Sequence, residues 1–148
     1  MTDDDLTRIE QAFGVQLPHG YRQLLKSPPR LLVALMEAFA KEETELEIPI
    51  YLKADVVVAA NEEVRDPEMV FGPDEEPWDR ELFVIGGDCG GNRYCIKPNS
   101  GSSTVYEWDH SGDCDLEVYG ETIPRYVERW FAELGELAAM DCREDTTE

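Results

Sequence analysis

The N-terminal part of the chain repeats one pattern, in which apolar side chains lie three and four positions apart, as on one face of an α-helix. The pattern occurs at Leu6, Ile9 and Phe13, at Tyr21, Leu24 and Leu25, and at Leu31, Leu32, Leu35, Ala38 and Phe39. The acids Asp3 to Asp5 favour a helix start, Gly14 favours an end, and Pro18 favours a second start. We therefore predict three short helices, the second ending at Ser27 to Pro29 and the third before the charged run 41–47.

Residues 48–64 combine strand-like and helix-like spacing. Ile48 to Leu52 alternates apolar and polar residues, which predicts a strand, and Pro49 favours a position at a sheet edge. Val56 to Val64 fits a helix capped by Asp55, whereas its consecutive valines equally suit a strand. The pattern alone leaves both structures open for Val56 to Val64.

The second half of the chain changes to the short period of β-strands. Arg65 to Arg80 is rich in proline, glycine and acids and should be a surface loop. Strand-like segments follow at Leu82 to Ile85, Arg93 to Lys97 and Thr104 to Trp108. Turn-forming residues at Gly86 to Asn92 and Pro98 to Ser102 separate them, which predicts an antiparallel meander.

The clearest helical stripe comes last. Its members are Ile123, Val127, Trp130, Leu134 and Leu137. An apolar stripe must pack on something, and the meander offers the natural partner. We therefore expect an α+β fold with an antiparallel sheet of about four to six strands and helices packed on it. The pattern indicates a single domain over residues 1–140 and a polar C-terminal tail at 141–148.

Charge narrows the classes of partner. The chain has 148 residues, and 33 Asp and Glu against 13 Lys and Arg give a net charge of −20. Such a surface repels nucleic acid and anionic lipid and attracts basic proteins, although solubility or proteome bias produces the same balance. The N-terminus shows no secretory signal, and no apolar stretch approaches the roughly 20 residues of a membrane span. We expect a cytoplasmic protein that binds neither nucleic acid nor membrane.

The sequence predicts neither a metal site nor a cofactor site. Its cysteines, none in a Cys-x-x-Cys pair, are Cys89, Cys95, Cys114 and Cys142, and we expect reduced thiols. The segment 109–115 lacks the ordered ligand pattern of an EF-hand loop. The glycines of Gly86 to Asn92 lead into another strand, whereas a phosphate loop leads into a helix. An enzyme that uses Cys89 or His110, with Asp109 beside it, is a weaker alternative because no nucleophile motif surrounds the thiol.

Two acid-rich regions are the candidate binding surface. Residues 62–88 hold ten acids and two arginines, and residues 98–124 hold six acids without Lys or Arg. The candidates for contact with a basic partner are Asp74, Glu75, Glu76, Trp78, Asp79, Trp108, Asp109, His110, Asp113 and Asp115. We expect the two tryptophans to act as aromatic anchors and the acids to steer association. Strand alternation could instead place Trp108 in the core, and a merely solvated acidic surface remains an alternative.

Several of these segments, taken in order, resemble a known family. Ile9 to Pro18, followed by Tyr21 to Leu25, is similar to the N-terminal signature of the SUKH superfamily, known for the Smi/Knr cell-wall-assembly regulators. Leu82 to Gly86, Asn92 to Ile96 and Val105 to His110 resemble its central strands, and the final helix with Trp130 also fits. The Asn-Gly-Gly common after the second helix of the family is absent, and Ser27, Pro28 and Pro29 stand there.

This resemblance implies an α+β domain without an active site. In bacteria it implies an immunity protein that neutralises a cognate polymorphic toxin, often a nuclease. The alternative within the same family is a general scaffold or regulatory module. The charge of the chain agrees with such a role, because a nuclease surface that binds phosphate is basic and an acidic domain can occlude it.

Overall fold

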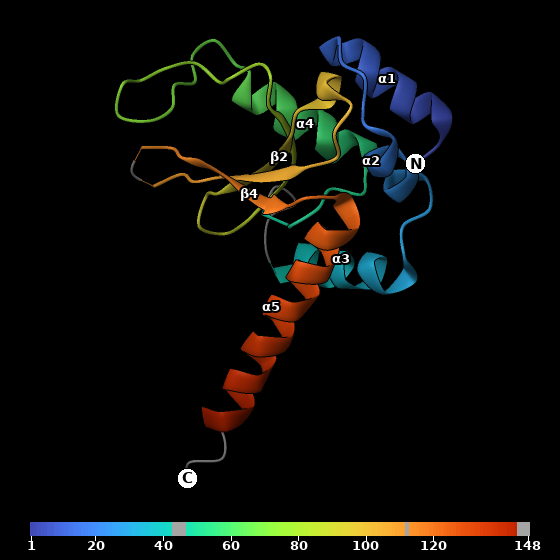
Figure 1. Ribbon diagram of the computed structural model, residues 1–148, viewed down its shortest axis with the longest axis vertical. Coiled ribbons are helices and arrows are strands. Elements are labelled where there is room, and N and C mark those ends of the chain that lie inside the picture. The colour runs from blue at the N-terminus through green and yellow to red at the C-terminus, as the bar shows by residue number, and fades with distance from the viewer. Residues whose placement is uncertain (43–46, 112, 145–148) are drawn as a thin grey trace.

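The computed structural model describes residues 1–42, 47–111 and 113–144, and within these ranges five α-helices and a four-stranded antiparallel sheet form one α+β unit (Figure 1). The fold class expected from the sequence is therefore confirmed. The sheet lies in the middle, with α1 and α4 on one side and α5 on the other (Figure 1). Among the described residues, no helix is long and apolar enough to cross a membrane.

The three predicted N-terminal helices are confirmed as α1 (Asp3–Phe13), α2 (His19–Lys26) and α3 (Arg30–Glu42). Thr2, rather than the acids after it, caps α1. Its Oγ1 accepts the Asp5 N–H at 3.1 Å, while Asp5 Oδ2 accepts the Thr2 N–H at 3.0 Å. Gly14 ends α1 in the left-handed conformation at φ 64°, where a glycine costs least.

Residues Ala54–Val64 form a helix, α4, which settles the alternative that the sequence left open. Lys53 occupies the N-cap position, and Asp55 lies in the first turn and does not cap. Asn61 is the one polar residue of α4 that is buried. Its amide lies against β1, so the helix is tied to the sheet by hydrogen bonds as well as by apolar packing.

The sheet has the order β1-β2-β3-β4, formed by β1 (Phe83–Gly87), β2 (Arg93–Ile96), β3 (Val105–Trp108) and β4 (Leu116–Gly120). The first three strands match the predicted meander, while β4 falls in a stretch for which no strand was predicted. The turn after β1 is shorter than expected, because Gly86 and Gly87 still belong to the strand. In that turn Gly91 adopts a positive φ of 87°.

The predicted strand Ile48 to Leu52 is wrong as a strand, although its place at the sheet edge is correct. This segment makes isolated backbone bonds to β1, from Tyr51 N–H to Ile85 O and from Gly87 N–H to Ile48 O, both at 2.8 Å. Pro49, which lacks an N–H, interrupts any continuous ladder. A Cβ at Gly86 would lie 1.7 Å from the Pro49 carbonyl oxygen, so this close approach requires glycine.

Neighbouring residues of β2 show which helix covers which face of the sheet. Side chains alternate along a strand, so Arg93 and Tyr94 point to opposite faces. Arg93 pairs with Glu63 of α4 at 3.4 Å, whereas the Tyr94 ring lies 5.4 Å from that of Tyr126 in α5 (Ile123–Glu144). The predicted packing of the last helix on the sheet is therefore confirmed. Four residues of the expected tail, 141–144, continue this helix, and 145–148 lie outside the described residues.

Candidate functional site

Two segments meet at the end of the sheet opposite the N-terminal helices (Figure 1). One is the predicted surface loop between α4 and β1, and the other is the connection between β3 and β4. An aromatic cluster joins them, because Phe71, Trp78 and Trp108 pack edge to face with ring centroids 5.3 to 5.5 Å apart. The indole N–H of Trp78 donates to Leu82 O at 3.1 Å. The loop is therefore held on the sheet by its own side chains.

The sequence favours Trp78 and Trp108 as aromatic anchors, with the core as the alternative for Trp108, and the structure buries both. The two residues are only 5% and 8% exposed. Trp108 lies on the sheet face that the loop covers, and Trp78 points from the loop onto it. A partner cannot insert these rings into a pocket while they fill the core, so they support the surface rather than anchor the partner.

The acids predicted alongside them do gather around one depression. This depression, the acidic hollow, has a volume of about 350 Å³ and is lined by Phe71, Gly72, Pro73, Asp74, Glu76, Pro77, Trp78, Asp79, Leu82, Trp108, Asp113 and Cys114. It therefore unites six predicted site residues from two segments more than 25 positions apart. Its lining combines the two buried indoles with exposed acids.

We call the exposed acids of this region the acidic rim: Asp74, Glu75, Glu76, Asp79, Asp113 and Asp115. Glu75 and Asp115 do not line the hollow but are chain neighbours of residues that do. Among the described residues, no member of the rim forms a salt bridge, whereas the acids Asp3, Glu10, Glu63 and Glu133 all pair with Arg or Lys. The negative charge of the rim is thus left uncompensated by the protein itself.

Asp109 and His110 lie in the β3–β4 connection and make hydrogen bonds that hold it in place. Asp109 Oδ1 accepts both the N–H and the hydroxyl of Ser111 at 2.7 Å, and these hydrogen bonds lower the pKa of Asp109. The His110 N–H donates to Asn92 Oδ1 at 3.0 Å. In the part of the chain that the structure describes, no hydrogen bond links Cys89, His110 and Asp109 side chains into a catalytic set.

A second depression adjoins the first across Phe71, Gly72 and Cys114. This loop hollow, of about 450 Å³, is also lined by Met69, Val70, Gly91, Arg93, Trp108 and His110. His110 therefore belongs to it and not to the acidic hollow. Sequence reasoning missed Met69 and Val70, although both are exposed apolar residues, at 36% and 50%. Their position in a Pro-rich and acid-rich loop gave no periodic signal.

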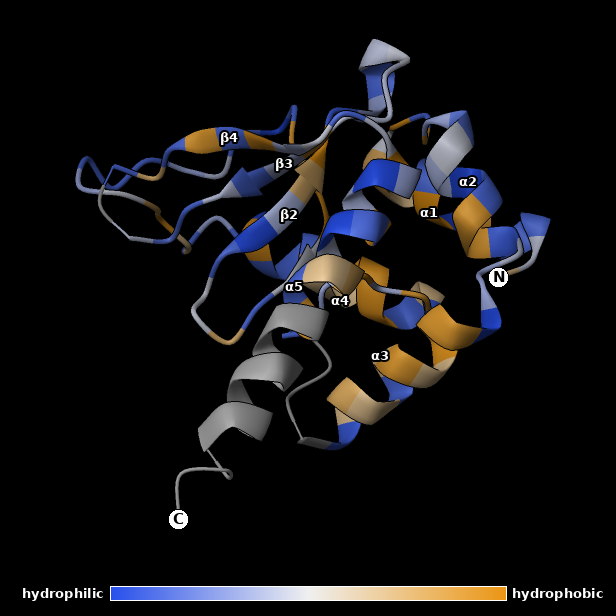
Figure 2. Ribbon diagram, turned by 60° about the horizontal axis from the view of Figure 1, so that its bottom comes forward, coloured by the Kyte–Doolittle hydropathy of each residue, from blue (hydrophilic) through white to orange (hydrophobic). Residues whose placement is uncertain are grey.

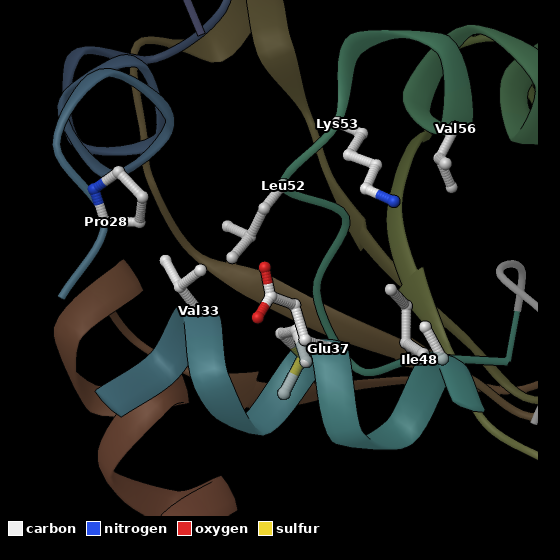
Figure 3. Close-up of a pocket in the computed structure, with 9 residues that line it drawn as sticks. Pro28, Val33, Glu37, Ile48, Leu52, Lys53 and Val56 are labelled. Carbon is white, nitrogen blue, oxygen red and sulfur yellow. The ribbon is translucent and has the colours of Figure 1, made fainter. Parts of the chain in front are cut away.

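A third depression, between α3 and the segment before α4, was also invisible to the sequence pattern because separate elements build it. This apolar groove has a volume of about 230 Å³ and is lined by Pro28, Val33, Met36, Glu37, Ala40, Ile48, Leu52, Lys53 and Val56. Glu37 and Lys53 reach toward it from opposite walls (Figure 3). No residue predicted for the functional site lines it, and Glu37 is the one acid among the described residues that do.

The structure defines the class as an α+β domain with an acid-lined hollow and, among the described residues, no cluster of His, Cys, Asp or Glu able to hold a metal. The model of the SMI1 / KNR4 family (SUKH-1) matches residues 1–129, so the chain belongs to this family. The family is known for protein–protein interaction and is generally non-catalytic. No curated protein and no solved structure matches the chain.

Proposed function

We propose that this protein is a bacterial immunity protein, which binds a cognate polymorphic toxin domain of basic character and occludes its active surface. The observation that carries the proposal is the acidic rim, six exposed acids without a salt bridge among the described residues around one hollow. Family membership supports binding of a protein partner, and the negative charge of the rim favours a partner with a positively charged surface.

Uncompensated charge at a rim has a defined physical effect. It adds little to the stability of a complex, but it raises the local concentration of a cationic partner and speeds association. A nuclease must present Lys and Arg to the phosphates of its substrate, so the same surface that grips nucleic acid is complementary to the acidic rim. One immunity protein bound there would exclude the substrate. The alternative within the family, a general scaffold or regulatory module, predicts a partner that is not toxic.

The test requires a toxin reading frame beside this gene, whose toxin domain is co-expressed with the protein and studied by stopped-flow binding. The rim variant Asp74→Asn/Glu76→Gln/Asp113→Asn should lower the association rate about tenfold at low salt and flatten its salt dependence. The control Asp4→Asn/Asp55→Asn/Glu121→Gln changes the net charge by the same amount at exposed sites outside the rim and should leave the rate within about twofold. Equal effects of the two variants would refute the rim as binding surface. Absence of both binding and protection would refute the immunity function.

A further inference from the structure

The two edges of the sheet differ in whether their outward backbone N–H and C=O groups have hydrogen-bond partners among the described residues. Along the β1 edge, the segment before α4 supplies two backbone hydrogen bonds, at Ile85 and Gly87. At Val84, the residue before Ile85 in β1, the Asn61 side chain makes two more hydrogen bonds to this edge. It accepts the Val84 N–H at 2.9 Å and donates to the Val84 C=O at 2.8 Å. The β1 edge is therefore closed to any further strand.

The β4 edge is open over its first three residues. In the described part of the chain, Leu116, Glu117 and Val118 have no backbone hydrogen bonds outside the ladder with β3. Asp109 N–H donates to Asp115 O at 2.9 Å, which marks Asp109 and Asp115 as a hydrogen-bonded pair. Such pairs alternate with non-hydrogen-bonded ones in an antiparallel ladder. The backbone N–H and C=O groups of Leu116 and Val118 thus point outward, toward solvent.

The side chains at this edge are exposed and apolar. Leu116 and Val118 are 37% and 56% exposed, and Figure 2 shows β4 at the outer edge of the sheet with hydrophobic positions on it. Leu116 lies opposite Trp108 in the ladder, and Trp108 lines the loop hollow together with Met69 and Val70. Among the described residues, the exposed large hydrophobic side chains number five, and four of them lie here: Met69, Val70, Leu116 and Val118. The apolar edge is therefore continuous with the surface that carries the acidic rim.

Charge decides what can occupy this edge. Asp113, Asp115 and Glu117 lie before and within the open part of β4. A second copy of the chain, paired antiparallel through β4, would bring these carboxylates against the same carboxylates, which destabilises a cross-strand pair. An extended segment with Lys or Arg alternating with apolar residues meets opposite charge at the acids and apolar surface at Leu116 and Val118.

We propose that β4 accepts such a basic, extended segment of the partner as an additional strand, hydrogen-bonded to Leu116 and Val118. This inference rests on the proposed function, because it assigns the mode by which the same partner is held. Backbone bonds along the edge would hold the complex, and Leu116 and Val118 would supply the apolar anchors that Trp78 and Trp108 cannot.

Amide hydrogen exchange measured by NMR tests the proposal residue by residue. In the free protein the amides of Leu116 and Val118 should exchange rapidly, whereas that of Glu117, bonded to Glu107, should be protected. The toxin domain encoded beside this gene should slow exchange at Leu116 and Val118 by at least about tenfold. Protection of the same two amides by raising the concentration of the protein alone would mean self-pairing and would overturn the choice of occupant.

A pair of variants separates the backbone from the side chain. Leu116→Pro removes an outward N–H at the first residue of the strand, a position where proline is tolerated in an edge strand. Leu116→Thr keeps the N–H and loses most of the apolar surface. We expect Leu116→Pro to weaken toxin binding at least about tenfold more than Leu116→Thr does, with the Glu117 amide still protected as evidence of an intact ladder.

The outcomes distinguish this inference from the function on which it rests. If the toxin domain binds the wild-type protein but leaves Leu116 and Val118 unprotected, strand addition is refuted and the immunity function stands. If it binds Leu116→Pro and Leu116→Thr equally well, strand addition is refuted in the same way. If it does not bind the wild-type protein at all, the proposed function fails and the inference fails with it.

Discussion

Asn61→Leu should destabilise the fold strongly, because the buried Asn61 amide makes hydrogen bonds to β1 that a neighbouring strand would otherwise make. The residue is 0% exposed and uses both ends of its amide. Nδ2 donates to Val57 O at 3.0 Å and to Val84 O at 2.8 Å, and Oδ1 accepts from Val84 N at 2.9 Å and from Arg65 Nη1 at 2.7 Å. Leucine has the same number and branching of side-chain heavy atoms and can make none of these bonds.

The size of the loss in unfolding free energy follows from the buried polar groups that lose their hydrogen-bond partner. Val84 is itself fully buried, so its N–H and C=O would both be left unsatisfied, at about 1 to 3 kcal/mol each. Arg65 keeps its bond to Leu82 O at 3.1 Å, and the Val57 carbonyl lies within α4, so these two losses are minor. Burial of the leucine side chain offsets about 1 to 2 kcal/mol. We expect a net loss of about 3 kcal/mol in the free energy of unfolding.

Urea unfolding followed by tryptophan fluorescence measures this loss. Glu62→Leu, at the adjacent exposed position of the same helix, introduces the same residue without touching the sheet and should change the stability by less than about 0.5 kcal/mol. A loss below about 1 kcal/mol for Asn61→Leu would refute the claim that this amide closes the β1 edge.

Three further predictions concern the core and one carboxylate. Trp108→Ala should lower the free energy of unfolding by about 3 to 5 kcal/mol in urea unfolding, as expected of a core residue, and a stable variant with weakened partner binding would restore its role as an anchor. Gly86→Ala should lower the melting temperature by several degrees, because the added Cβ would collide with the Pro49 carbonyl; an unchanged value would show that the edge segment moves freely. Burial, followed by the nearby Asp88, raises the pKa of Glu107, so its ionised form disfavours folding above that pKa. Glu107→Gln should therefore melt higher than the wild type at pH 7, and the difference should shrink as the pH falls through the raised pKa; a constant difference would contradict this.

The sequence was sufficient wherever local rules decide the structure. Helical spacing with Gly14 and Pro18 as boundaries located α1 and α2, because capping and backbone preference act within a few residues. Alternation and turn residues located the strands β1 to β3 in the same way. The family signature and the net charge of −20 are properties of the sequence itself, and the matched family agrees with the former.

The local sequence patterns did not predict β4, and they predicted a strand at Ile48 to Leu52 where none forms. Leu116 and Val118 were not recognised as a strand because they lie in an acidic stretch and leave their apolar face exposed. Ile48 to Leu52 shows the opposite case, a buried apolar segment that contacts β1 without joining it as a strand. Strand formation requires a partner in the right register, and a partner distant in sequence leaves no local periodic signal.

Only the tertiary structure decided which residues form a surface. The sequence named the acids of both segments, but the packing of Phe71, Trp78 and Trp108 brings those acids around one hollow and buries the two indoles expected to be anchors. It also closed one edge of the sheet with Asn61 and left the other open at Leu116 and Val118. Burial and edge pairing depend on contacts between segments far apart in the chain. The composition therefore determined that the protein is acidic, and the fold determined where that acidity and the exposed apolar residues meet.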